Sequence, residues 1–112
     1  MSWGGELGPI ITAVEPRLKA SLLLSGGFGQ VTVRSESDPV NYVTRVKVPT
    51  LMLNGKYDTL SVPETAQKPM FDMLRTKDKQ RAQDDTDHIP TSIFDIRETL
   101  AWLDRYLGPV NR

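Results

Sequence analysis

The apolar positions of this chain form short continuous runs separated by helical stripes, a combination typical of α/β folds. Two apolar runs, at 20–24 and 50–54, are each closed by turn residues. Runs this short predict strands that are buried on both faces of a parallel sheet. The segment 79–84 is strongly charged and predicts a third strand at an edge of the sheet. The fold class indicated is therefore α/β, with a short, mostly parallel sheet of about three strands flanked by helices.

The first helix is predicted near the start of the chain, before the first strand. Four apolar positions there follow the spacing of one helical face: Leu7, Ile10, Ile11 and Val14. Pro9 interrupts this stripe, because an interior proline loses a hydrogen bond and clashes with the preceding turn. Either Pro9 begins the regular helix and residues 3–8 are irregular, or the helix kinks at Pro9. Glu15 and Pro16 are expected to end it.

Two further helices are predicted in the second half of the chain. Ser61 and Glu64 have the spacing of a capping box, and a stripe follows that we expect to be buried: Ala66, Met70 and Met73. The final helix is expected to be capped within 92–95 and to end at Gly108 and Pro109. Its stripe is formed by Ile96, Leu100, Leu103 and Leu107.

The segment 26–47 connects the two apolar strands and is polar and glycine-rich at its start. Asp38 and Pro39 predict one helical turn within it. A strand, a crossover and a second strand fit right-handed parallel topology. No repeat or internal boundary is visible, so residues 1–112 are expected to form a single domain, with the crossover 26–47 in place of a lid.

The composition argues against several classes of partner and of site. The 112 residues contain 14 Lys and Arg against 14 Asp and Glu, and this balance argues against a polyanionic partner such as a nucleic acid. The absence of cysteine excludes disulfides, a thiol nucleophile and thiolate metal sites. No stretch approaches the length of a membrane span, and no apolar leader opens the chain. We expect a cytoplasmic protein with no membrane partner and no cofactor.

Three residues suggest chemistry because each stands in a suitable local context. Ser2 precedes a helical pattern within Ser-x-Gly-Gly, Asp58 follows a buried strand, and His88 precedes the last helix. Nucleophilic catalysis needs a hydroxyl on a tight turn, an imidazole that takes its proton, and a carboxylate that orients the imidazole. The backbone N–H of Trp3 could then donate to the oxyanion at a helix N-terminus. The order of Ser, acid and His is that of the α/β-hydrolases.

Each of these residues also has a structural explanation. Ser2 could cap a helix or lie in a frayed terminus, Asp58 could be a surface acid after a core strand, and His88 could be a loop residue. Metal binding by the acidic loop is a further alternative, although its spacing matches no standard site. The residues concerned are Asp84, Asp85, Asp87 and His88.

Four segments of the chain together resemble the C-terminal half of an α/β-hydrolase catalytic domain. They are 1–9 (MSWGGELGP), 46–58 (VKVPTLMLNGKYD), 87–90 (DHIP) and 99–107 (TLAWLDRYL). The chain is similar to the dienelactone hydrolase and prolyl-oligopeptidase-like branch, including hydrolase domains appended to some bacterial serine/threonine kinase-like proteins. The resemblance implies that Ser2 is the nucleophile, Asp58 the acid and His88 the base. It also implies that 20–24, 50–54 and 79–84 are the last strands of a larger sheet.

The chain departs from the family pattern in ways that affect the expected function. The first glycine of Gly-x-Ser-x-Gly, the earlier strands and the loop that supplies a second oxyanion donor are not in this sequence. Strand 20–24 is therefore expected to present an open edge and to pair in a homo-oligomer. We expect a carboxylesterase-like serine hydrolase that acts on small esters through an acyl-enzyme. The alternatives are a weak or inert fragment that acts by association, and a peptidase of the prolyl-oligopeptidase type.

Overall fold

A three-stranded parallel sheet forms the centre of the molecule. The structure is a computed structural model, which describes residues 1–30 and 32–111. The strands β1 (Ser21–Leu24), β2 (Thr50–Gly55) and β3 (Lys79–Asp84) lie in the order β1-β2-β3 and are all parallel. All six residues of β2 are buried, whereas the charged β3 is at an edge, as its composition predicts. The expected α/β fold class is confirmed.

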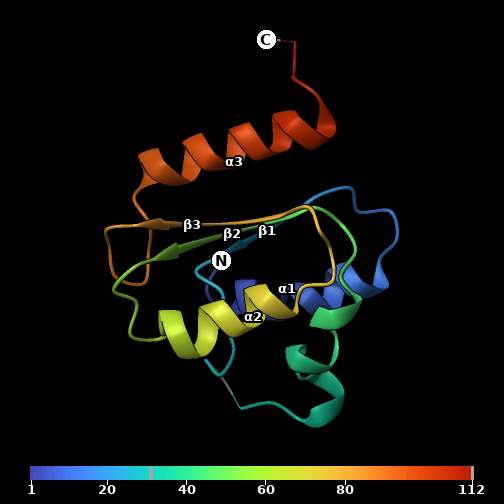
Figure 1. Cartoon of the computed structure of the whole chain (residues 1–112), viewed down its shortest axis with the longest axis vertical. Coiled ribbons are helices and arrows are strands. Elements are labelled where there is room, and N and C mark those ends of the chain that lie inside the picture. Colours follow the sequence, from blue (N-terminus) through green and yellow to red (C-terminus); the bar gives the residue numbers. More distant parts are fainter. Residues whose placement is uncertain (31, 112) are drawn as a thin grey trace.

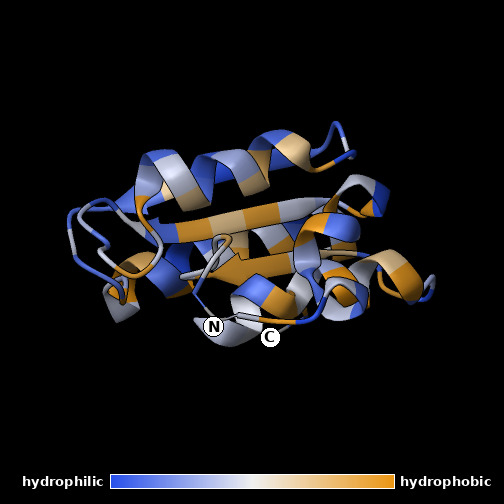
Figure 2. Ribbon diagram, turned by 90° about the horizontal axis from the view of Figure 1, so that it is seen from below, coloured by the Kyte–Doolittle hydropathy of each residue, from blue (hydrophilic) through white to orange (hydrophobic). Residues whose placement is uncertain are grey.

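Helices cover both faces of this sheet. Helix α3 (Ser92–Leu107) lies on one face, whereas α1 (Trp3–Val14) and α2 (Lys68–Met73) lie on the other (Figure 1). Alternation along β2 divides the core: Met52 faces α2, while Leu51 and Leu53 face α3. The hydrophobic colour is accordingly concentrated along the strands at the centre of the molecule (Figure 2). Buried residues on the α2 side are Leu23, Val43, Val46, Met52, Met70 and Leu74.

Helix α1 packs through its small residues rather than through its apolar stripe. It runs unbroken from Trp3, with Pro9 buried inside it, so an irregular segment 3–8 is wrong. Gly5 lies against the Leu24 carbonyl and Gly26, so closely that a Cβ on Gly5 would overlap both. This approach turns the helix so that Ile11 and Val14 are 59% and 62% exposed. Half of the predicted stripe therefore faces outward, while Leu7 and Ile10 are half-buried.

Helix α3 also presents its predicted stripe mainly to solvent. Ile96 is 58% exposed and Leu107 56% exposed, whereas Trp102 is buried against Leu51 and Leu53. The aromatic residues explain this orientation, because a tryptophan removes more apolar area from water than an isoleucine or leucine does. The helix ends at Gly108 with φ of 84°, as predicted.

The remaining predictions for the connecting segments are mixed. The crossover contains a 3₁₀ turn at Pro39–Asn41, which begins with the Asp38 side chain accepting a hydrogen bond from the Val40 N–H, as expected. Before α2 lies a π-helical turn, Pro63–Gln67, without a side-chain cap. The predicted capping box is therefore wrong, because the hydroxyl of Ser61 is bound elsewhere. Among the described helices, none has both the length and the hydropathy needed to cross a membrane.

Candidate active site

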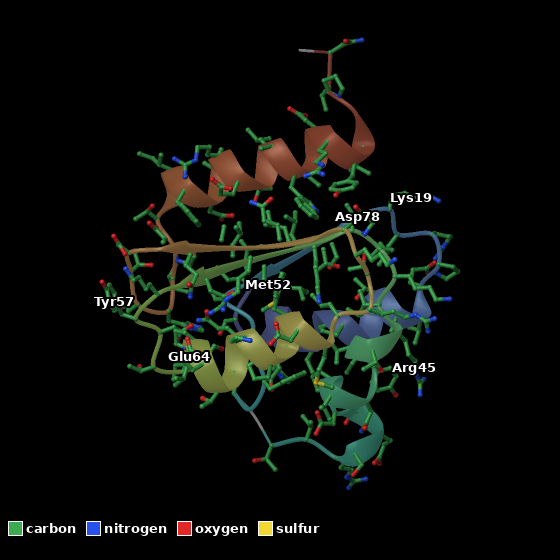
Figure 3. The ribbon with its side chains drawn as sticks, viewed as in Figure 1. Lys19, Arg45, Met52, Tyr57, Glu64 and Asp78 are labelled. Carbon is green, nitrogen blue, oxygen red and sulfur yellow. The ribbon has the colours of Figure 1, made fainter. Side chains whose placement is uncertain are left out.

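The three residues predicted from the sequence meet at the carboxyl ends of the strands. Asp58 follows β2 by three residues, His88 lies in the loop between β3 and α3, and Ser2 precedes α1. Tyr57, the neighbour of Asp58, marks this end of the molecule, and Lys19 and Asp78 mark the opposite end (Figure 3). Open α/β sheets bind ligands at the carboxyl ends of their strands.

A continuous chain of hydrogen bonds connects the three side chains. The His88 Nδ1 lies 2.8 Å from Asp58 Oδ2, and the His88 Nε2 lies 2.7 Å from Ser2 Oγ. A carboxylate can only accept, so Nδ1 carries the imidazole proton and donates to Asp58. Nε2 is then an acceptor, and the Ser2 hydroxyl donates to it. This is the arrangement needed for proton removal from a serine nucleophile.

The backbone at Ser2 has the strained geometry expected of a nucleophile turn. Ser2 has φ of 56° and ψ of −121°, a region that non-glycine residues rarely adopt. The Ser2 N–H donates to the Leu24 carbonyl at 2.8 Å, and the Glu6 N–H donates to the Ser2 carbonyl at 3.0 Å. These contacts attach the residue both to the end of β1 and to the first turn of α1. Ser2 is therefore held at both of its backbone polar groups.

Asp58 is buried and hydrogen-bonded through both carboxylate oxygens, which fixes its orientation toward His88. Its side chain is inaccessible to solvent, and Oδ1 accepts from the N–H groups of Leu60 and Ser61 at 2.8 and 2.9 Å. The buried Gln67 holds the same loop by donating to the carbonyls of Gly55 and Ser61. The carboxylate thus has its second oxygen free for the imidazole.

The loop that carries His88 is attached directly to the loop that carries Asp58. The Lys56 N–H donates to the Asp84 carbonyl, and the Tyr57 N–H donates to the Thr86 carbonyl. Gly55 lies so close to residues 86–87 that no side chain fits there. At the other end of the loop, the N–H and hydroxyl of Thr91 both donate to Asp84, and these bonds lower the pKa of that carboxyl.

Gln30 is a site residue that the sequence does not predict. Its Oε1 lies 3.3 Å from Ser2 Oγ, and its Nε2 donates to the Ser25 carbonyl at 2.8 Å and to the hydroxyl of Ser61. The residue lies in the crossover, where no periodicity or motif marks it. Its only signal in the sequence is its position a few residues after β1, because the other site residues also follow the carboxyl ends of the strands.

The rim of the site is apolar and acidic. Several large apolar residues that are close in sequence to Ser2, Asp58 or His88 are exposed: Trp3, Tyr57, Leu60, Val62 and Ile89. Three carboxylates precede His88 in the loop 84–87, and of these Asp85 pairs with Lys56 at 3.3 Å. The surroundings therefore have a net negative charge and offer apolar contact surface.

The two remaining predictions about the site concern Trp3 and metal binding. The Trp3 N–H begins α1, and no acceptor for it is found within residues 1–30 and 32–111. It is thus available to a bound oxyanion, although this role remains a prediction. Among the described residues, no group of three or more His, Cys, Asp or Glu could hold a metal ion.

Comparison with solved structures identifies the fold. The zinc-bound structure of a cold-adapted esterase from an Arctic intertidal metagenomic library superposes with a TM-score of 0.78 and 26% identity, over 95% of this chain and 46% of the esterase. A Klebsiella pneumoniae protein described as a dienelactone hydrolase gives a TM-score of 0.74 at 22% identity, over 95% of this chain and 50% of that protein. The chain has an α/β-hydrolase fold.

Sequence comparison agrees with this α/β-hydrolase fold. A Salmonella typhimurium protein named as a carboxymethylenebutenolidase is 34% identical over 74 residues, which are 65% of this chain and 27% of that protein. No protein-family profile matches the chain. The chain therefore spans about half the length of the two solved hydrolases and about a quarter of the curated relative.

Proposed function

We propose that the chain is a carboxylesterase-like serine hydrolase that acts on small carboxylic esters through an acyl-enzyme. The observation that supports this most is the contact of 2.7 Å between Ser2 Oγ and His88 Nε2, with Ser2 in a strained turn. A hydroxyl held this way needs no rearrangement to lose its proton to the imidazole. The similarity to an esterase and to proteins described as dienelactone hydrolases supports the same reaction class.

Acylation would begin when Ser2 Oγ attacks the ester carbonyl carbon. The proton moves to His88 Nε2, and Asp58 stabilises the imidazolium that forms. The N–H of Trp3 donates to the developing oxyanion. His88 then gives its proton to the alcohol as the C–O bond breaks, and the acyl group remains on Ser2.

The rim supports a preference for uncharged esters with apolar groups. Trp3 follows the nucleophile in the chain and Leu60 follows Asp58 by two residues, and both expose apolar surface, while the carboxylates of 84–87 repel an anionic substrate. A lactone that bears a carboxylate, as the name of the Salmonella typhimurium carboxymethylenebutenolidase suggests for that protein, would meet this negative charge. We therefore propose small neutral esters as the substrates of this chain.

Hydrolysis of p-nitrophenyl acetate and butyrate tests the proposal. We expect turnover by the unmodified chain that falls by at least about 10³-fold in Ser2→Ala and in His88→Ala. Ser37→Ala is the matched control, because this serine is exposed and its hydroxyl donates to the nearby Arg34 carbonyl. Turnover that survives Ser2→Ala, or that is absent throughout, would favour the alternative of an inert hydrolase fold that acts by association. Cleavage of peptides in preference to esters would favour the peptidase alternative.

We also propose that two copies of the chain associate through the open edge of β1. Within the described chain β1 pairs only with β2, and the Ser21 and Ser25 N–H groups point to β2. The alternate residue, Leu22, therefore directs its N–H and carbonyl away from β2, toward the unpaired edge. Sedimentation equilibrium is expected to show a dimer at micromolar concentration, which Leu22→Pro should weaken. A monomer at that concentration would contradict this proposal.

A further inference from the structure

Gln30 lies where it could act on deacylation, the step of the proposed reaction in which water releases the acyl group from Ser2. Its amide orientation is determined by its partners, because the Ser25 carbonyl, 2.8 Å away, can only accept and must face Nε2. The amide oxygen Oε1 is therefore the atom that lies 3.3 Å from Ser2 Oγ. Two acceptors, Gln30 Oε1 and His88 Nε2, flank one hydroxyl that has one proton. The shorter contact, 2.7 Å, is the one to His88.

Among the described residues, Ser2 is the hydrogen-bond donor to Gln30 Oε1, and acylation removes this donor. An acylated Ser2 Oγ has no proton to donate, so both Nε2 and Oε1 become free to accept. A water molecule has two O–H groups and needs two acceptors. The position between His88 and Gln30 supplies both of them, close to the acyl group on Ser2.

We propose that Gln30 is a positioning residue that orients the hydrolytic water during deacylation. This inference rests on the proposed function, because it requires an acyl group on Ser2. One water proton moves to His88 Nε2 as the water oxygen bonds to the acyl carbon. The other proton stays on that oxygen and donates to Gln30 Oε1. The bond from the acyl carbon to Ser2 Oγ then breaks, the proton on His88 passes to Oγ, and the carboxylic acid leaves.

Gln30 itself is held firmly enough for this role. Its Nε2 has two partners on separate segments, the Ser25 carbonyl at the end of β1 and the Ser61 hydroxyl in the loop that follows Asp58. Ser25 also has a positive φ of 53°, a strained conformation that directs its carbonyl toward Gln30. The same contacts explain why Ser61 does not cap the following helix.

Methanol distinguishes this role from a merely structural one. Methanol has a single O–H group, which His88 can accept, so its attack on the acyl-enzyme does not require Gln30. Loss of Oε1 should therefore slow hydrolysis while leaving methanolysis and acylation near their original rates. A structural defect at Ser2 would instead slow all three steps together.

The experiment measures p-nitrophenyl butyrate turnover in the presence of methanol, with the initial burst, the steady-state rate and the ratio of methyl butyrate to butyric acid. In Gln30→Met we expect an unchanged burst rate and a ratio raised roughly tenfold, the order of one lost hydrogen bond. Gln80→Met is the control, since Gln80 is exposed on β3 at the opposite end of the sheet.

A ratio that is unchanged in Gln30→Met, or a burst rate that falls in step with the hydrolysis rate, overturns the role of Gln30 and leaves the proposed function intact. The absence of any burst and of any turnover that depends on Ser2 in the unmodified chain overturns both. A ratio that is raised in Gln30→Met with an unchanged burst rate, and that is unchanged in Gln80→Met, supports the assignment.

Discussion

Replacing Gly55 with alanine tests whether the two loops of the site depend on each other. A Cβ at Gly55 would lie 2.6 Å from the Asp87 carbonyl carbon and 2.8 Å from the Thr86 carbonyl oxygen, and closer still to the Asp87 carbonyl oxygen. Ordinary carbon–carbon contacts are about 3.5–4.0 Å, so one backbone must move by about 1 Å or more. All of these atoms are backbone, which cannot rotate away as a flexible side chain could.

The displacement would reach the reacting groups directly. Asp87 immediately precedes His88, whose Nε2 lies 2.7 Å from Ser2 Oγ. A shift of about 1 Å in a catalytic group can cost about 10²-fold in rate. Overpacking of this kind also destabilises a fold by about 1–3 kcal/mol. Gly55→Ala is therefore expected to lose about 10²-fold in activity even where it remains folded, in addition to about 1–3 kcal/mol of stability.

Urea denaturation measures the stability of the variant, and p-nitrophenyl butyrate hydrolysis measures its activity. The activity is compared under conditions where the variant is at least nine-tenths folded, which requires a free energy of unfolding of roughly 1.3 kcal/mol or more. Gly4→Ala is the control for stability, because a Cβ at Gly4 meets nothing within 4 Å and Ala favours the helix. A folded Gly55→Ala chain that keeps full activity would refute the close coupling of the Asp58 and His88 loops.

Three further predictions concern the carboxylates of the site. In Asp58→Asn the amide oxygen should keep accepting from the N–H groups of Leu60 and Ser61, so that the amide N faces His88. The amide N donates to Nδ1, which moves the imidazole proton to Nε2 and leaves no acceptor for the Ser2 hydroxyl. The kcat with p-nitrophenyl butyrate should therefore fall roughly 10³–10⁴-fold. Asp84 has a lowered pKa, so its stabilising effect is present above the ordinary aspartate pKa and is lost as pH falls through the lowered value. Urea melts of Asp84→Asn should therefore show a deficit at pH 7 that vanishes in strong acid; a deficit independent of pH would contradict this. Finally, mono-p-nitrophenyl succinate should react more slowly than the butyrate ester at low salt, with the difference shrinking as salt is added; equal rates would show that the acidic rim does not select substrates.

The strands and the positions of Ser2, Asp58 and His88 could be predicted because each depends on local sequence. A short apolar run such as 50–54, closed by turn residues, suits a buried strand. The residue positions after strands and before helices place Asp58 and His88 at the carboxyl ends of the strands. The Ser2 context is likewise local, since it needs only a turn that precedes a helix. Their catalytic roles remain predictions.

The orientation of the helices could not be predicted, because periodicity locates a stripe without showing what that stripe faces. In α1, close contact between Gly5 and Gly26 outweighs the apolar stripe, and in α3 the aromatic residue Trp102 is buried instead. Gln30 was missed for a related reason. Its partners at Ser2 and Ser61 are 28 and 31 residues away, and only the folded chain brings them together.

The most direct test of the account is covalent labelling of Ser2 by a fluorophosphonate, read by intact mass and peptide mapping. The account predicts one label per chain on Ser2, formed quickly in the unmodified protein, slowly in His88→Ala and not at all in Ser2→Ala. A protein that stays unlabelled, or a label that Ser2→Ala does not remove, would show that Ser2 is not an activated nucleophile.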